Sequence, residues 1–160
     1  MIRLLIVDDQ RLVRTCICAR LNAETDFSIV AEADSGELAC EKLEQIEVDI
    51  VLMDLNMPGI GGMQATKELL AADPKIKVIG LSMYVTGPYP REFLALGGVG
   101  YVSKDADSQE LIDAIRAVYR GESFVSQDVL SGLENPESAG DELDLDLAEN
   151  SSMTKQPVDS

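Results

Sequence analysis

Five short apolar runs alternate with five stretches of helical periodicity, and this alternation determines the fold class more directly than any other feature. The runs, rich in Val, Ile and Leu, lie at 3–7, 27–33, 48–53, 77–82 and 100–103. The helical stretches follow them near 11–23, 35–46, 62–72, 88–96 and 107–121. Strands that alternate with helices indicate a parallel sheet covered by helices on both faces. We therefore predict one α/β domain.

Several helix ends carry residues that satisfy free backbone groups. Ser35 is placed to cap the second helix through its side chain. Pro88 or Pro90 falls in the first turn of the fourth helix, where a missing N–H costs little. Asp107 starts a sequence that resembles a capping box, and Gly121 is expected to end the last helix.

Charge is distributed unevenly along the chain, which has a formal net charge of −16. Residues 134–160 hold eight acidic residues against Lys155, and we predict a disordered acidic tail there. We divide the rest into a domain at 1–121 and an extension at 122–133. The negative charge argues against binding of nucleic acid by these residues. Because Lys155 is the only base after 121, we expect no basic recognition helix in that part.

The residue types that are missing or isolated exclude several kinds of chemistry. The chain has no histidine, which removes catalytic triads, histidine-ligated zinc and a histidine phosphoacceptor. The three cysteines, Cys16, Cys18 and Cys40, lack metal-site spacing, and we expect Cys16 to fill the core. The first strand turns acidic too soon for a signal peptide, and no run approaches the roughly 18 apolar residues of a membrane span. We expect a cytoplasmic protein with reduced thiols.

Polar side chains follow four of the predicted strands at the point where each ends. Asp8 and Asp9 follow the first, Asp54 the third, Ser82 the fourth and Lys104 the fifth. Each has an ordinary structural explanation by itself, such as a helix cap, a turn or a solvated charge. In an open parallel sheet, however, the carboxyl ends of the strands meet at one edge, where ligands bind. We therefore expect these side chains to form one site.

Three converging carboxylates require a cation. About 4 Å apart, they repel by roughly 4 kcal/mol per pair at an effective dielectric near 20. Hard oxygen ligands suit Mg²⁺, which also binds phosphate. Lys104 offers a charge for a phosphoryl oxygen and Ser82 a hydroxyl. Because phosphoryl transfer needs mainly positioning and charge neutralisation, we predict Asp54 as an acceptor carboxylate. The Asn56 carbonyl would reach the metal, and Pro58 with the following glycines would turn the chain away.

The motifs "LIVDDQ", "VLMDLNMPGIGG", "VIGLS" and "GYVSK" occur in this order over residues 1 to about 121. This set resembles a response-regulator receiver domain of two-component signalling. The stretches "GPYPREFLALGGVGYVSKDA" and "LIDAIRAVYRGESFVS" further resemble the NarL/UvrY/GacA group, whose receivers precede a LuxR-type helix-turn-helix. The resemblance implies a flavodoxin-like doubly wound fold with five parallel strands in the order 2-1-3-4-5. It also implies these roles: phosphorylation site, Asp54; Mg²⁺ environment, Asp8, Asp9, Asp54 and the Asn56 carbonyl; switch hydroxyl, Ser82; phosphate-binding lysine, Lys104; aromatic switch, Tyr101.

A signalling function follows from this resemblance. A sensor histidine kinase would dock near the first helix and phosphorylate Asp54; Arg11 and Arg14 either help to receive it or form a solvated face. Tyr101 would then turn inward and change the surface of residues 83–120, favouring a homodimer or another partner. In that group the output is transcription through a C-terminal DNA-binding domain, which is not seen here. The alternative is a stand-alone adaptor or phosphate sink.

Other function classes fit less well. A phosphatase of the haloacid-dehalogenase type needs a second acid two residues after Asp54, where Asn56 stands. A flavin or nucleotide binder would want glycines or hydroxyls after the first strand, where the acidic pair would repel phosphate. We expect a phosphoacceptor protein and not an enzyme. Two departures from the group are Gln10, in place of a frequent histidine, and Met83, which is bulkier than usual and would shield the phosphoryl group.

Overall fold

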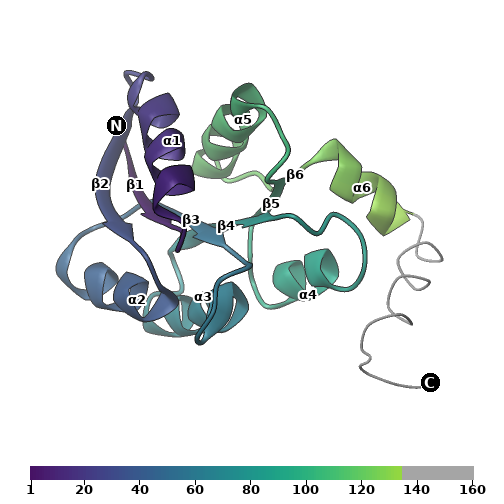
Figure 1. Ribbon diagram of the computed structural model, residues 1–160, viewed down its shortest axis with the longest axis horizontal. Coiled ribbons are helices and arrows are strands. Elements are labelled where there is room, and N and C mark those ends of the chain that lie inside the picture. The colour runs from purple at the N-terminus through teal and green to yellow at the C-terminus, as the bar shows by residue number, and fades with distance from the viewer. Residues whose placement is uncertain (135–160) are drawn as a thin grey trace.

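A computed structural model describes residues 1–134 (Figure 1), so the tail predicted at 134–160 lies, apart from Glu134, outside the described residues. Strands and helices alternate along the chain. They are β1 Ile2–Val7, α1 Arg11–Asn22, β2 Phe27–Ala33, α2 Gly36–Gln45, β3 Ile50–Asp54, α3 Gly61–Ala72, β4 Lys77–Ser82, α4 Tyr89–Ala95, β5 Gly100–Ser103, α5 Ser108–Tyr119, β6 Phe124–Val125 and α6 Gln127–Glu134. None of these helices is both long and apolar enough to span a bilayer.

The sheet has the order β2-β1-β3-β4-β5-β6, and all neighbouring strands are parallel. The predicted order 2-1-3-4-5 is confirmed. The sixth strand was not expected from the sequence: β6 pairs with β5, so that Tyr101 lies opposite Val125. The extension at 122–133 therefore contains regular structure that packs on the domain. Its two-residue strand is too short to produce a recognisable periodicity.

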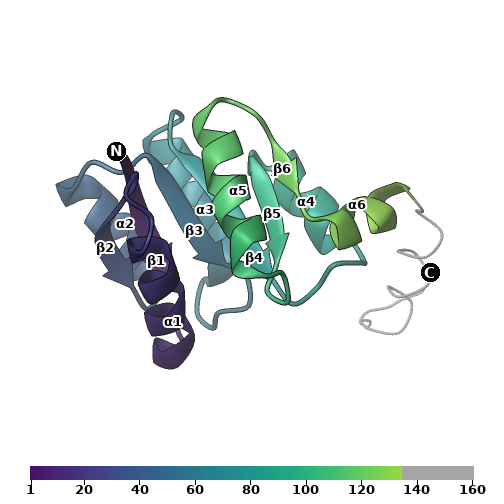
Figure 2. The ribbon, with the colours of Figure 1, turned by 90° about the horizontal axis from the view of Figure 1, so that it is seen from above.

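Helices cover both faces of the sheet. Helices α1 and α5 lie on one face and α2, α3 and α4 on the other, while α6 lies beyond β6 (Figures 1 and 2). Alternate residues of β1 enter different cores: Leu4 and Ile6 join the cluster under α1 and α5, and Leu5 and Val7 join the opposite cluster. All five residues of β3 are buried. Burial on both faces explains why the central strands read as continuous apolar runs.

The predicted helix ends have the expected interactions. Ser35 Oγ accepts a hydrogen bond from the backbone N–H of Leu38 at 3.1 Å. The Asp107 carboxylate accepts one from the N–H three residues later, at 2.8 Å. Pro90 lies in the first turn of α4. Gly121, at φ 96°, follows the last turn of α5 in the left-handed region, where glycine is favoured.

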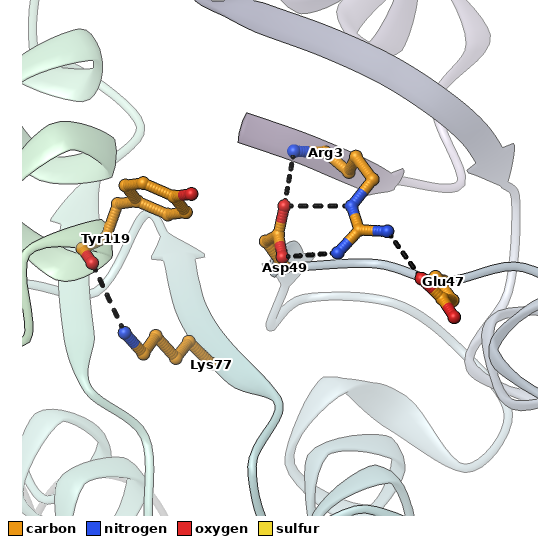
Figure 3. A network of polar contacts seen from close by, with 5 residues as sticks. All are labelled: Arg3, Glu47, Asp49, Lys77 and Tyr119. Atoms are coloured by element: carbon orange, nitrogen blue, oxygen red, sulfur yellow. Dashed lines mark hydrogen bonds and ion pairs between the residues drawn. The ribbon is translucent and has the colours of Figure 1, made fainter. Parts of the chain in front are cut away.

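Charged side chains at the amino-terminal edge of the sheet bond to neighbouring segments (Figure 3). The Arg3 guanidinium holds Asp49 through bonds of 2.9 and 3.1 Å and Glu47 through a bond of 2.7 Å. Lys77 Nζ donates to carbonyl oxygens at the end of α5, at 3.1 Å and, to Tyr119, at 3.5 Å. The hydrogen bonds from Arg3 lower the pKa of the Asp49 carboxyl. These charges connect the strand starts to neighbouring segments.

Candidate functional site

The opposite edge of the sheet brings the predicted polar residues together. Asp8 follows β1, Asp54 ends β3, and Lys104 follows β5. Lys104 Nζ lies 2.8 Å from Asp54 Oδ1 and 3.7 Å from Asp8 Oδ2. The backbone N–H of Lys104 donates to the carbonyl of Ser82, the last residue of β4, at 2.9 Å. Four strand ends therefore meet at one site, as the alternation of strands and helices predicts.

Asp8, Asp9 and Asp54 form an acid cluster in which one oxygen from each residue lies within 4.8 Å of the others. Asp8 and Asp54 are buried, whereas Asp9 is exposed. Asp8 Oδ1 accepts a hydrogen bond from the Gln10 N–H at 2.8 Å. Asp8 Oδ2 is buried and accepts none. A buried carboxylate oxygen without a donor has coordination capacity left for a cation.

The surroundings of the acid cluster make it unfavourable for all three carboxyl groups to be ionised at once. Burial raises the pKa of the Asp8 carboxyl, and the charges of Asp54 and Asp9 act in the same direction. The Gln10 N–H and the Lys104 ammonium oppose that rise. Three carboxylates against one lysine leave a net charge of −2. Oxygen ligands in this number and charge fit a small divalent cation such as Mg²⁺.

The loop after Asp54 holds its carboxylate in place. The Asn56 N–H donates to Asp54 Oδ1 at 2.9 Å. Gly61 has φ 76°, a conformation that favours glycine. At Gly62 an added Cβ would lie 2.4 Å from the Asp54 carbonyl oxygen, so helix α3 could not start this close to β3 with any side chain there. The glycines thus allow α3 to begin directly behind Asp54.

Asn56 makes a further contact that the sequence did not reveal. Its Oδ1 accepts a hydrogen bond from the Met83 N–H at 3.2 Å and so joins the loops that follow β3 and β4. Met83 is 56% exposed and lines the mouth of the site, where its bulk was expected to act as a shield. No local pattern predicts a bond between two loops 27 residues apart.

Ser82 and Tyr101 lie on adjacent strands and meet the same loop. Ser82 Oγ accepts a hydrogen bond from the Tyr84 N–H at 2.9 Å, and the Tyr101 hydroxyl donates to the Tyr84 carbonyl at 2.6 Å. The Tyr101 ring is fully buried and packs edge-on against Phe93, with 6.0 Å between centroids. Burial raises the pKa of Tyr101 to about 12. From the sequence we expect Tyr101 to reach an inward position on phosphorylation; in the structure the ring occupies it.

A groove of about 580 Å³ extends from the acid cluster between α1 and α5. Its polar end is formed by Asp9, Asp54, Asn56, Met83 and Lys104. Its apolar part is formed by residues of α1, the sheet and the start of α5: Val13, Ile17, Leu21, Leu81, Val102, Ala106 and Leu111. Asp54 is only 1% exposed and lies at the bottom of the polar end.

Two expectations about α1 need correction. The solvated face considered for Arg14 is not found: its side chain is largely buried, pairs with Glu32 at 3.0 Å and donates to the Asp8 carbonyl, so it connects α1 to β1 and β2. A role of Arg14 in receiving a kinase stays a prediction. Arg11 is exposed. Cys16, expected in the core, is exposed and borders the groove, whereas Cys18 is buried. The buried face of α1 is therefore centred closer to Cys18 than the apolar spacing indicated.

The fold and this edge define a doubly wound α/β protein with a polar site at the carboxyl ends of its strands. Residues 4–116 match the family described as the response regulator receiver domain, and the chain belongs to this family.

Similar proteins are found among curated sequences and solved structures. Response regulator GacA of Pseudomonas viridiflava is 41% identical over 133 residues, which cover 83% of this chain and 62% of GacA. Response regulator UvrY of Escherichia coli strain K12 is 40% identical over 129 residues, 81% of this chain and 59% of UvrY. A LuxR-family two-component response regulator from Aurantimonas sp. SI85-9A1 superposes with a TM-score of 0.78 at 30% identity, covering 85% of this chain and 97% of that one. The chain thus spans less than two thirds of GacA or UvrY.

Proposed function

We propose that this chain accepts a phosphoryl group from a sensor histidine kinase on Asp54 and changes a surface in response. The observation that carries this proposal is the contact of 2.8 Å between Lys104 Nζ and Asp54 Oδ1, beside the carboxylates of Asp8 and Asp9. A buried acceptor carboxylate, a cation opposite it and further acids at one strand edge suit phosphoryl transfer, which depends on positioning and charge neutralisation.

The transfer itself involves one bond formed and one broken. Asp54 Oδ1 is held by Lys104 and the Asn56 N–H, so Oδ2 is the oxygen we assign to attack phosphorus. An acyl phosphate bond forms on Asp54 as the P–N bond to the kinase histidine breaks. The leaving imidazole keeps the electron pair of that bond and takes a proton from solvent. Lys104 then neutralises charge on the phosphoryl oxygens.

Mg²⁺ is the cofactor that this donor set would hold. Asp8, Asp9, Asp54 and the Asn56 carbonyl would supply hard oxygen ligands, and the buried Asp8 Oδ2, which accepts no hydrogen bond, supports that assignment. When bound, the ion supplies positive charge that neutralises the carboxylates and the phosphoryl oxygens. The chain's own contribution is to hold one carboxylate oxygen each of Asp8, Asp9 and Asp54 within 4.8 Å of one another and to keep Lys104 against Asp54.

The kinase would approach along the groove between α1 and α5. This groove leads directly to Asp54, and its apolar part offers surface for a partner helix. At the start of α1, Arg11 and Leu12 are exposed, and Leu12 is exposed to 76%. A donor histidine on a protruding element could therefore reach the bottom of the site while its neighbours contact α1.

The response would pass through Ser82 and Tyr101. A phosphoryl group adds about −1.5 to −2 charges at neutral pH. The Ser82 hydroxyl would donate to it, and Ser82 and Tyr101 both bond the backbone of Tyr84. A shift of Ser82 would therefore move the loop before α4 together with Tyr101. The surface formed by α4, β5 and α5 would change and favour a homodimer or another partner.

Transcriptional output is proposed from the resemblance to LuxR-type regulators and from the relatives GacA and UvrY. The aligned region covers 62% of GacA, and the described residues of this chain correspond to the receiver part. A stand-alone adaptor or phosphate sink is the second candidate. The formal net charge of −16 favours it over direct contact of these residues with DNA.

One mass measurement tests the proposal. The chain is incubated with acetyl phosphate and Mg²⁺, and the modified residue is mapped. We expect one phosphoryl group on Asp54 and none in Asp54→Asn. Asp49→Asn is the matched control, because Asp49 directly precedes the same strand that Asp54 ends. Labelling of Asp54→Asn at the rate of the unsubstituted chain would refute the assignment.

A further inference from the structure

The segment after α5 returns to the domain and closes the edge of the sheet. Strand β6 pairs with β5, and α6 contacts both β5 and α4 (Figures 1 and 2). Within α6, Val129 is fully buried. The extension thus covers part of the α4–β5–α5 surface that is proposed to respond to phosphorylation.

Ser126, between β6 and α6, bonds β5 at two points. Its backbone N–H donates to the Tyr101 carbonyl at 3.0 Å, and its Oγ accepts from the Ser103 N–H at 3.0 Å. Ser126 is only 2% exposed, so its hydroxyl cannot be replaced easily by solvent. The residue after Ser103 is Lys104, which contacts Asp54 at 2.8 Å. Ser126 therefore fixes the strand segment that carries both Tyr101 and Lys104.

Val129 connects α6 to the same region through packing. It belongs to the buried cluster that includes Tyr101 and Phe93. Any movement of the Tyr101 ring away from its buried position changes the packing of this cluster, because protein interiors have few voids to absorb a displaced ring. Docking of α6 and the inward position of Tyr101 thus support each other.

We propose that Ser126 is a positioning residue, through which the docked β6–α6 segment sets the positions of Tyr101 and Lys104 at the phosphoacceptor site. This inference rests on the proposed function. Lys104 acts on the phosphoryl group, and Ser126 acts only through β5. Because coupling between two equilibria is reciprocal, docking that stabilises the phosphorylated form of Asp54 must itself be strengthened by phosphorylation.

The experiment compares two serine-to-alanine variants within the extension. Ser126→Ala removes the buried acceptor of the Ser103 N–H; Ser123→Ala changes an exposed serine three residues earlier and is the matched control. Labelling of Asp54 by acetyl phosphate and Mg²⁺ is followed by mass. We expect labelling about tenfold slower in Ser126→Ala and unchanged in Ser123→Ala. Thermal unfolding is recorded so that rates are compared on folded protein.

A second readout separates positioning from simple stabilisation. Amide hydrogen exchange at Ser103 and Ser126 is measured in the unsubstituted chain with Mg²⁺, with and without acetyl phosphate. We expect phosphorylation to slow exchange at both amides by about fivefold or more. A contact that only stabilises the fold would lower the unfolding temperature in Ser126→Ala but would leave exchange insensitive to phosphorylation.

The outcomes distinguish the two proposals. If the unsubstituted chain takes no label on Asp54, the proposed function fails, and the inference fails with it. If Asp54 is labelled but Ser126→Ala reacts at the unsubstituted rate, the inference alone is overturned. The same holds if exchange at Ser103 and Ser126 does not respond to phosphorylation.

Discussion

At the amino-terminal edge of the sheet, Arg3 bonds both Asp49 and Glu47, and Lys77 bonds carbonyl oxygens at the end of α5 (Figure 3). At the carboxyl-terminal edge, Lys104 pairs with Asp8 and Asp54, beside Asp9 of the same acid cluster. Asp49 and Glu47 are thus both bonded by a base, whereas the acid cluster has two more negative charges than Lys104 balances. Pairing at the first edge connects segments of the fold, whereas the excess at the second leaves capacity to bind a cation and a phosphoryl group.

The two edges also differ in the direction in which the pKa values of their carboxyl groups are shifted. Hydrogen bonds from Arg3 lower the pKa of Asp49, whereas burial raises the pKa of Asp8. Ionisation of Asp49 thus stabilises the folded state, and ionisation of Asp8 opposes it. A carboxylate kept where its charge is unfavourable indicates a requirement other than folding, in agreement with the proposed site.

The largest effect is expected from removing the cation of the acidic edge. Lys104→Met leaves Asp54 and Asp8 without their counter-charge in a buried site, so the free energy of unfolding should fall by about 3 kcal/mol. Labelling of Asp54 by acetyl phosphate should slow by about 100-fold. Chemical denaturation and mass measurement check the two effects. A variant that keeps the full labelling rate would contradict the role given to Lys104.

Mg²⁺ should stabilise the chain through the acidic edge. At about 100 times its dissociation constant, the ion should raise the free energy of unfolding by about 2.7 kcal/mol. Asp8→Asn should lose most of this gain and Asp49→Asn should keep it, because Asp8 belongs to the acid cluster and Asp49 does not. Thermal unfolding at constant ionic strength measures the gain. Equal responses of both variants would place the ion elsewhere.

The two edges should respond to pH with opposite sign. The raised pKa of Asp8 means that its stabilising contribution is complete below the unfolded-state value of about 3.9 and is lost as pH rises through the folded-state pKa. Asp8→Asn should therefore stabilise the chain at pH 7 by roughly 1 kcal/mol and have less effect near pH 4.

Asp49, with its lowered pKa, contributes stability above that unfolded-state value and loses it as pH falls through the folded-state pKa. Asp49→Asn should destabilise the chain at pH 7, and the difference should shrink in acid. Denaturation of both variants across about pH 2–7, which includes the region below the unfolded-state carboxyl pKa, decides the question. Parallel trends would remove the contrast between the edges.

The smallest effect is expected at Lys77. Its ammonium lies at the negative end of α5, and Lys77→Met should cost roughly 0.5 kcal/mol. Labelling of Asp54 should not change, because the substitution lies at the edge opposite the acid cluster. Chemical denaturation measures the cost, and labelling by acetyl phosphate provides the comparison with Lys104→Met. A slower labelling rate would show that the two edges are coupled.

Much of the candidate site could be predicted from the sequence, because the apolar runs show where the strands end. The apolar runs are long enough to locate the ends of four strands, and a parallel sheet brings those ends to one edge. Asp8, Asp54 and Lys104 do lie together, and the Ser82 carbonyl bonds the Lys104 N–H, while their roles in phosphoryl transfer stay predictions. The order of the first five strands follows from the family resemblance and is confirmed.

The remaining features depend on contacts that leave no local pattern. Strand β6 has two residues, and Ser126 gains its importance only from bonds to β5. The bond from the Met83 N–H to Asn56 joins two loops, and the local sequence of each loop does not determine its conformation. Cys16 was misjudged because the spacing of apolar residues gives the direction of a helix face only approximately.

The depth of Asp54 has a consequence for the donors that can react. Asp54 is 1% exposed and lies at the bottom of the groove. A phosphoryl group carried on a flat protein surface could not reach bonding distance of it. A phosphorylated side chain on a convex helix, or a molecule as small as acetyl phosphate, could enter. In the proposed function, hydrolytic water would enter by the same groove, which Met83 lines. The width of that opening would then control both how the signal arrives and how long it persists.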